Sequence, residues 1–321
     1  MLKLNTLSGF GSGVSGGAAG ATYGYTQGGN ASLLGERMVY ATSVQSAHTD
    51  ANLSQGKENP NATSDTTLYG YTYAGGAWEG AGRVRETDRT TLATSVTAAH
   101  TDADLSTDRY LVASTSDSTT YGYACGGSHA SGNMNQVTGD RTVFATSVTS
   151  AHTDADLTVG RQCFASVSDT GTYGYVLGGY SPTAHATDAD RITFSTSTAA
   201  AHTDADIPQG NNAGFCVTDG VLYGYHAGGH TGSYITTVNR LVYSTSVLSA
   251  HTDTNLSQTR MAAASHSDNA VYGYCLGGNP AASKDDTDRI TFSTAVFALN
   301  TDSDMVTAML NHAGFSDGSP S

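Results

Sequence analysis

A short segment rich in tyrosine and glycine recurs six times along the chain and constrains its fold more than any other feature. It reads Tyr-Gly-Tyr, two variable residues and Gly-Gly, as in residues 173–179, and successive copies start 46 to 52 residues apart. The copies begin at Tyr23, Tyr69, Tyr121, Tyr173, Tyr223 and Tyr272, and the second is one residue longer than the others. A fixed period of this length is typical of architectures in which each repeat forms one small unit.

Each repeat is predicted to contain four short strands. In one copy, residues 212–217 form the first strand, and residues 223–229 form the second, which Gly-Gly ends because glycine permits positive φ. The variable loop 230–239 leads to a third strand at 240–246, and the fourth strand is expected to begin at His251. Four short strands per repeat, without helical periodicity, are typical of a β-propeller blade.

The two ends of the chain predict a closed ring. Residues 311–317 match a first strand and its turn, whereas the first repeat begins at Tyr23 without a first strand. One C-terminal strand is therefore expected to complete the sheet formed by residues 22–54, which removes free edges. The sequence thus predicts an all-β fold, a single six-bladed propeller over residues 22–321. A flexible arm rich in Gly and Ala is expected over residues 1–21.

An arginine and the tyrosine pair recur in every repeat, which favours structural roles. The arginines open the third strand, and we expect each to reach a carboxylate or carbonyl between blades, the alternative being a solvated charge. The tyrosines should lie on one face of their strand and pack between blades, the alternative being an aromatic platform for sugars. The arginines are Arg37, Arg89, Arg141, Arg191, Arg240 and Arg289.

A His-Thr-Asp-x-Asp/Asn motif follows the third strand in five repeats, with Asn300 replacing the histidine in the sixth. Imidazole beside two carboxylates offers the ligand types of a zinc or calcium site. A catalytic or metal centre is normally needed once, however, so we predict a turn in which Thr and Asp accept backbone N–H groups. No metal or cofactor is predicted, with weak calcium binding at these turns as the alternative. The histidines are His48, His100, His152, His202 and His251.

The order of these features resembles the kelch repeat over residues 22–317, most clearly from residue 256 to residue 278. One departure is that the Trp usual in the fourth strand of kelch repeats is replaced here by the His-Thr-Asp motif. The many small residues also resemble those of kelch-like propellers in the virions of tailed phages. The resemblance implies that the variable loops share one face of the ring with the loops between fourth and first strands.

The loops that follow Gly-Gly differ between copies in length and content, although the framework around them repeats. Binding residues tend to lie on loops held by a rigid scaffold, so we expect a binding surface there, the alternative being loop drift without a ligand. The candidate binding residues are Trp78, Arg83, Tyr180, His185, His230 and Tyr234.

Composition narrows the set of partners. The net charge of -14 repels phosphate backbones and anionic lipid, so neither nucleic acid nor a membrane is an expected partner. No apolar run is long enough for membrane insertion, and the opening residues predict no signal peptide, so synthesis in the cytoplasm is expected. No CxxC spacing occurs, and buried free thiols are predicted at Cys125, Cys163, Cys216 and Cys275.

No recognisable catalytic motif stands out among the unrepeated residues, so the protein is predicted not to be an enzyme. We predict a virion structural or attachment protein, such as a capsid decoration, tail or fibre component, on the virion surface. It would bind other virion proteins or itself through Leu4, Leu7 and Phe10 of the arm, and a host glycan through the variable loops. The alternatives are a carbohydrate-active propeller enzyme, similar to sialic-acid mutarotases, and a cellular kelch-type interaction module.

Overall fold

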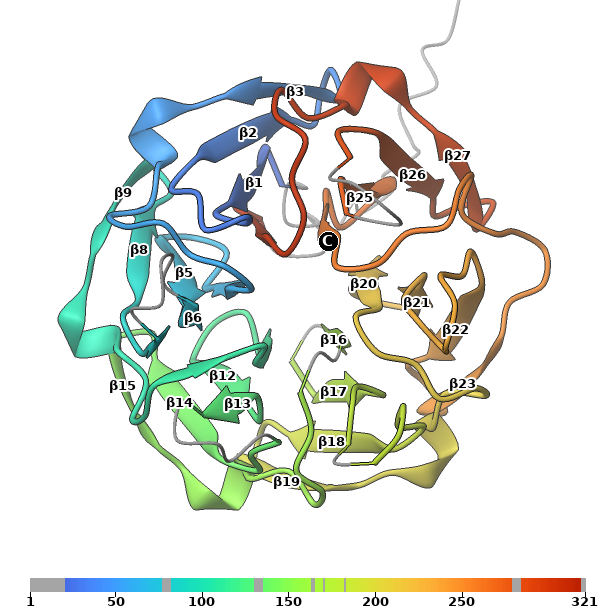
Figure 1. Cartoon of the computed structure of the whole chain (residues 1–321), viewed down its shortest axis with the longest axis horizontal. Helices are drawn as coiled ribbons and strands as arrows, with labels where there is room; N and C mark the ends of the chain where they lie inside the picture. Colours follow the sequence, from blue (N-terminus) through green and yellow to red (C-terminus); the bar gives the residue numbers. More distant parts are fainter. Residues whose placement is uncertain are drawn as a thin grey trace, which may run out of the picture.

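The structure is a computed structural model that describes residues 21–76, 82–129, 135–162, 165–169, 171–181, 183–278 and 284–318. Within these residues the chain forms six four-stranded antiparallel sheets arranged around a central axis (Figure 1). The first strands of neighbouring sheets contact one another around that axis, and the fourth strands lie at the periphery. The prediction of an all-β, six-bladed propeller is therefore confirmed.

Each blade is ordered from the axis outward as first, second, third and fourth strand. Blade 1 is β28 (Ala313–Ser316), β1 (Tyr23–Gln27), β2 (Gly35–Val39) and β3 (Val44–Ala47). Blade 2 is β4 (Asn61–Ser64), β5 (Tyr69–Tyr73), β8 (Asp88–Thr91) and β9 (Val96–Ala99). Blade 3 is β11 (Ala113–Ser116), β12 (Tyr121–Cys125), β14 (Gly139–Val143) and β15 (Val148–Ala151).

The second half of the ring repeats this order. Blade 4 is β16 (Ala165–Ser168), β17 (Tyr173–Leu177), β18 (Ala189–Thr193) and β19 (Thr198–Ala201). Blade 5 is β20 (Phe215–Thr218), β21 (Tyr223–Ala227), β22 (Val238–Val242) and β23 (Val247–Ala250). Blade 6 is β24 (Ala264–Ser267), β25 (Tyr272–Leu276), β26 (Thr287–Thr291) and β27 (Val296–Leu299). Two small ladders join β6 (Gly75–Gly76) to β7 (Arg83–Val84) and β10 (Arg109–Tyr110) to β13 (Ser128–His129).

The ring closes as the sequence predicts, because β28 pairs with β1 from Gln27↔Ala313 to Gly24↔Ser316. The hairpin turn of this blade is assembled from both ends of the described chain. Asp317 Oδ1 accepts hydrogen bonds from the backbone N–H groups of Thr22 (2.7 Å) and Tyr23 (2.8 Å). The equivalent Asp65 accepts three such bonds within one continuous turn. The Asp317 carboxylate thus holds together a hairpin turn whose two halves come from segments far apart in the chain.

The fourth strand lies earlier than we predicted. It was expected to begin at the repeated histidine, but β3 ends at Ala47 and His48 follows it. The reason is a tight turn at Ser43, whose φ of 53° ends the third strand and reverses the chain. The His-Thr-Asp motif instead leads to the next blade, in five copies as a 3-10 turn: η1 (Thr49–Ala51), η3 (Thr101–Ala103), η4 (Thr153–Ala155), η5 (Thr203–Ala205) and η6 (Thr301–Ser303).

Three side chains of one blade converge on a single residue of the next, an arrangement we call the interblade clasp. At Ser197 of blade 4, the Oγ atom lies 2.7 Å from the Tyr123 hydroxyl and accepts a bond from Arg141 Nη1 at 3.1 Å. The backbone carbonyl of Ser197 lies 3.2 Å from His152 Nε2. Ser197 is the left-handed residue of its third-to-fourth turn, with φ of 55°. The clasp therefore fixes one blade to the turn of its neighbour.

The clasp repeats around the ring. The tyrosine–serine pairs are Tyr25–Ser95, Tyr71–Ser147, Tyr123–Ser197, Tyr175–Ser246 and Tyr274–Ser43. Each repeated arginine also lies over the ring of the first tyrosine of its own blade, 4.1 to 4.8 Å from the centroid. The expectation of a carboxylate or carbonyl partner for the arginines was therefore wrong for those that reach across, which bond a serine hydroxyl.

The junction between blades 5 and 6 lacks one clasp bond, because Ala295 stands where the other blades have serine. Replacing Ala295 with Ser should stabilise the protein by about 1 kcal/mol, since Tyr225 would gain a hydroxyl partner. The backbone φ of 54° at Ala295 matches that of the five serines, so no new strain arises. The reciprocal change, Ser246→Ala, should destabilise by about 1–2 kcal/mol because Tyr175 and Arg191 lose their partner. Urea denaturation measures both, and shifts of the same sign in the two variants would contradict the clasp.

Candidate binding site

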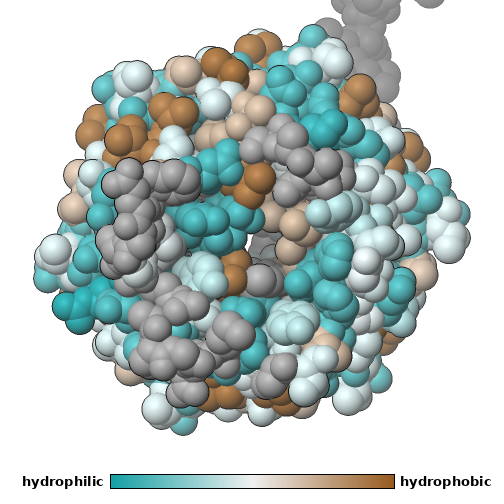
Figure 2. Space-filling model, viewed as in Figure 1, coloured by the Kyte–Doolittle hydropathy of each residue, from teal (hydrophilic) through white to brown (hydrophobic). Residues whose placement is uncertain are grey.

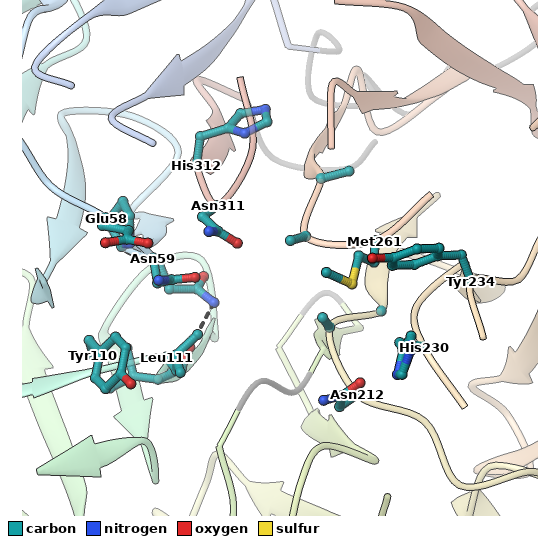
Figure 3. A pocket seen from close by; sticks show the side chains of 17 residues that line it. Glu58, Asn59, Tyr110, Leu111, Asn212, His230, Tyr234, Met261, Asn311 and His312 are labelled. Carbon is teal, nitrogen blue, oxygen red and sulfur yellow. Dashed lines mark hydrogen bonds between the residues drawn. The ribbon is translucent and has the colours of Figure 1, made fainter. Parts of the chain in front are cut away.

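A cavity of about 470 Å³ opens at one end of the axis (Figure 3). Its wall comes mainly from the segments that carry the chain from a fourth strand to the next first strand. One part of the wall presents the amides of Asn59 and Asn311, and another presents Met261 and Tyr234. Figure 2 shows this face of the ring, where both hydrophilic and hydrophobic residues border the hollow on the axis. The cavity therefore combines amide groups with apolar and aromatic surface.

The rim of this cavity is a chain of left-handed residues joined by backbone hydrogen bonds. Asn59 N–H donates to Asn311 O (3.0 Å), Asn311 N–H to Ala262 O (2.8 Å), and Ala262 N–H to Ala213 O (2.8 Å). Leu111 N–H completes the described part of the chain by donating to Asn59 O at 3.4 Å. All five have φ between 53° and 58°. The backbone of the rim is thus fixed by its own bonds, while three residue types, Asn, Leu and Ala, occupy these five positions.

Four of the six predicted binding residues form a row of rings beside the cavity. Ring centroids lie 5.6 Å apart between Tyr180 and His185, 5.3 Å between His185 and His230, and 5.3 Å between His230 and Tyr234. The row crosses from the variable loop of blade 4 to that of blade 5. His230 and Tyr234 also line the cavity, and 37% of Tyr234 is exposed. The row and the cavity therefore make one continuous surface.

The other predicted residues lie elsewhere. Trp78 and the arm residues Leu4, Leu7 and Phe10 fall outside the described residues, as does Cys163. Arg83 lies in β7, and the description there covers the backbone alone. The repeated arginines and histidines belong to the blade junctions and take no part in the cavity wall. Cys125, Cys216 and Cys275 are buried free thiols.

The second carboxylate of the His-Thr-Asp-x-Asp motif accepts a hydrogen bond from a backbone N–H group. Asp104 Oδ1 accepts the Thr87 N–H at 2.9 Å, and Asp156 Oδ1 accepts the Gly139 N–H at 2.7 Å. Across the ranges that the structure describes, no three His, Cys, Asp or Glu side chains gather in a metal-binding group. The motif therefore anchors the link between blades to the start of the third strand.

Sequence reasoning missed the residues of the rim. Asn59, Asn311 and Met261 lie in the segments between fourth and first strands, which the sequence analysis placed on the same face as the variable loops without naming any of their residues. A signal was present, because in five blades the residue two places before the first strand is Asn, Leu or Ala rather than one repeated type. What the sequence did not show was that these positions meet around one axis.

Three buried histidines have pKa values below the ordinary value of histidine. Burial lowers the pKa of His226 and His312 to about 4, and that of His266 to about 3. His312 lines the cavity, and its Nε2 accepts the Ala264 N–H at 3.3 Å. His266 Nδ1 lies 2.8 Å from the hydroxyl of Tyr40. Each side chain is therefore held in its neutral form at neutral pH.

No protein-family model matches the chain, and no curated protein matches it in sequence. Its class is therefore defined by architecture, a six-bladed β-propeller, and this fold suggests a protein-interaction or binding module. Among the described residues no helix has the length and apolar character needed to cross a membrane.

Acid should destabilise the propeller through these histidines. Their pKa values in the folded chain lie below the ordinary value of about 6.5, so the unfolded chain takes up protons first as the pH falls. Their contribution to stability is complete above pH 6.5 and is lost progressively toward pH 4. We expect a loss of about 2 kcal/mol per histidine between pH 7 and pH 5. Urea midpoints at pH 7, 6 and 5 should fall less steeply for His226→Gln than for the unmodified protein, and parallel curves would refute this explanation.

Proposed function

We propose that the protein is a non-enzymatic binding module that recognises a carbohydrate at the mouth of its axis. The observation that carries this proposal is the continuous surface formed by the row from Tyr180 to Tyr234 and the cavity of about 470 Å³ beside it. A concave site with apolar walls and a few convergent polar groups is the usual form of a small-molecule site.

The chemistry of the wall favours a sugar. The amides of Asn59, Asn212 and Asn311 both donate and accept hydrogen bonds, which matches hydroxyl groups that do the same. Exposed aromatic rings such as Tyr234 offer a flat apolar face with a polar tip, suited to the apolar face of a pyranose ring. Among the described residues Glu58 is the single carboxylate of the cavity wall, so the site also accepts ligand hydroxyl donors at a charged group.

The setting that we propose for this module is a virion, where it serves as a decoration, tail or fibre component. The resemblance of the repeats to those of virion propellers supports this setting. A closed ring in which five of six blade junctions carry the tyrosine–serine bond of the clasp also suits a particle that persists outside a cell. The glycan would then belong to the surface of a host.

Tyr234→Ala should weaken glycan binding at least tenfold, because it removes the most exposed ring of the row while leaving the blade core intact. Binding is first measured on a glycan array and then by calorimetry with the best neutral oligosaccharide. Leu222→Ala is the matched control, since Leu222 is 58% exposed in a first-to-second turn at the opposite end of blade 5. Equal affinity of Tyr234→Ala and Leu222→Ala would rule out the row as the binding surface.

A second candidate, a carbohydrate-active enzyme, is favoured by one observation. His312 lines the cavity, no other blade has histidine at its position among the described residues, and burial lowers its pKa to about 4. A pKa this far below neutrality makes the imidazole a weak base, so this candidate rests on the unrepeated position of His312 in the cavity wall. The bound glycan, incubated with protein and followed by NMR, distinguishes the two: an unchanged glycan supports the binding module. If the protein converts the glycan and His312→Gln abolishes that conversion, the binding module is wrong and the protein is an enzyme.

The arm provides a test of the virion setting. Ala21, which the sequence analysis placed in the arm, is buried and donates its N–H to Asp268 O at 3.1 Å, so the deletion should end at residue 20. We expect the full chain to assemble and the chain lacking residues 1–20 to be monomeric, as measured by light scattering and negative-stain microscopy. Replacing Leu4, Leu7 and Phe10 with Ser should act like the deletion, whereas Asn5→Ala with Thr6→Ala should not. Identical masses for the full and shortened chains would contradict an assembly role.

A further inference from the structure

In four blades a buried Lys or Arg from the link before the first strand pairs with an aspartate of the third strand. The pairs are Lys57–Asp88, Arg109–Asp140, Arg161–Asp190 and Arg260–Asp288, and every member is at most 1% exposed. In blade 6, Arg260 donates to the Asp286 carbonyl (2.7 Å) and to Asp288 Oδ2 (3.0 Å). The other carboxylate oxygen of Asp288 accepts the N–H of Ser257 at 3.0 Å, in the link from blade 5. Cation, carboxylate and backbone N–H thus form one buried network.

Blade 5 has lost all three members of this network. Asn211 stands at the position of the arginine and Asn239 at that of the aspartate. Pro208, which has no N–H, stands where Ser257 stands in the next link. The Asn211 side chain donates to the Gly228 carbonyl at 2.6 Å, but it is too short to extend along the path of a guanidinium. Blade 1 differs, because it keeps the carboxylate: Glu36 accepts the N–H groups of Val306 and Thr307.

A cavity of about 340 Å³ lies where the network is missing. Asn211, Asn239 and Pro208 all line it. Asn255 lines it too, at the position where Asp206 of the preceding link and Asn52 of the first link each accept a backbone N–H. These departures from the repeat lie far apart in the sequence and meet at one place. Because the equivalent groups form a single network in blade 6, their joint loss leaves one opening at this place.

We propose that this blade 5 pocket is a binding site for an uncharged polyhydroxyl ligand of the size of a monosaccharide. Apart from the imidazole of His251, whose Nε2 lies 3.1 Å from the Ala295 carbonyl, the described residues of its wall carry no ionisable side chain. A charged ligand would therefore find no carboxylate, ammonium or guanidinium partner, which is costly in a partly enclosed site. The Asn211 amide is already bonded to the Gly228 carbonyl and the His230 N–H. The amides of Gln209, Asn239 and Asn255 supply donors and acceptors, and Ile235 and Val238 supply apolar surface. Hydroxyl groups on a carbon ring complement both.

The blade 5 pocket is separate from the axial cavity and does not depend on the function proposed for it. Asn211 and Ile235 line the pocket, while their chain neighbours Asn212 and Tyr234 line the axial cavity. The two sites therefore lie on opposite sides of the same two segments. Changes to the pocket leave the row of rings in place, and this allows the two sites to be tested independently.

The experiment restores the repeat. The triple variant Pro208→Ser, Asn211→Arg and Asn239→Asp recreates the network of blade 6 and should fill the pocket with a guanidinium while preserving the fold. Saturation-transfer NMR is recorded with glucose, galactose, mannose and N-acetylglucosamine, and with glucuronate and glucosamine as charged counterparts. We expect a neutral sugar to give a signal that falls at least tenfold in the triple variant and persists in Tyr234→Ala.

A second variant tests the pocket in case the triple variant does not fold. Thr252 is exposed and lines the opening, so Thr252→Trp should block entry without altering the buried groups. The proposal is overturned if no neutral sugar gives a signal, or if the charged sugars bind as well as the neutral ones. It is equally overturned if the signal survives in the triple variant, or survives in Thr252→Trp when the triple variant is unfolded. A signal lost only in Tyr234→Ala assigns binding to the axial cavity and removes the blade 5 pocket.

Discussion

The interblade clasp is the interaction on which the rest of the structure depends. A four-stranded blade cannot cover its own apolar face, and the second tyrosine of each repeat is fully buried only because the neighbouring blade lies against it. One left-handed residue, such as Ser197, receives a hydroxyl, a guanidinium and an imidazole from the preceding blade. Since every junction uses the same turn, the angle between blades is nearly constant, and six of them close the ring.

Closure of the ring then forms the two cavities that are candidate binding sites. The rim of the axial cavity is held by its own backbone bonds, which leaves the side chains at those positions free to differ. Blade 5 illustrates the other route to a site. A buried ion pair needs both charges, because one partner alone leaves an uncompensated charge. Asn211 and Asn239 replace cation and anion together and leave a cavity whose described wall has no carboxylate, ammonium or guanidinium group.

The sequence predicted the scaffold well and the site in part. Tyr180, His185, His230 and Tyr234 were identified because they lie in the segments that vary most, and the structure brings these four together. The partner of the repeated arginines was missed because the bond crosses to another blade, which periodicity does not reveal. The fourth strand was misplaced because a left-handed Ser43 gives no sequence signal comparable to glycine. Asn59 and Asn311 were missed because their proximity exists only around the axis.

By itself the sequence determined the number of blades, the strands per blade and the closure by the C-terminal strand. These follow from local periodicity and from a partial repeat at each end, such as residues 313–317, and both are properties of the chain read in order. Tertiary structure decided which side chains meet: the clasp, the rim and the blade 5 pocket each join residues from different repeats. Such contacts depend on how the ring curves, and that curvature results from the packing of whole blades against one another.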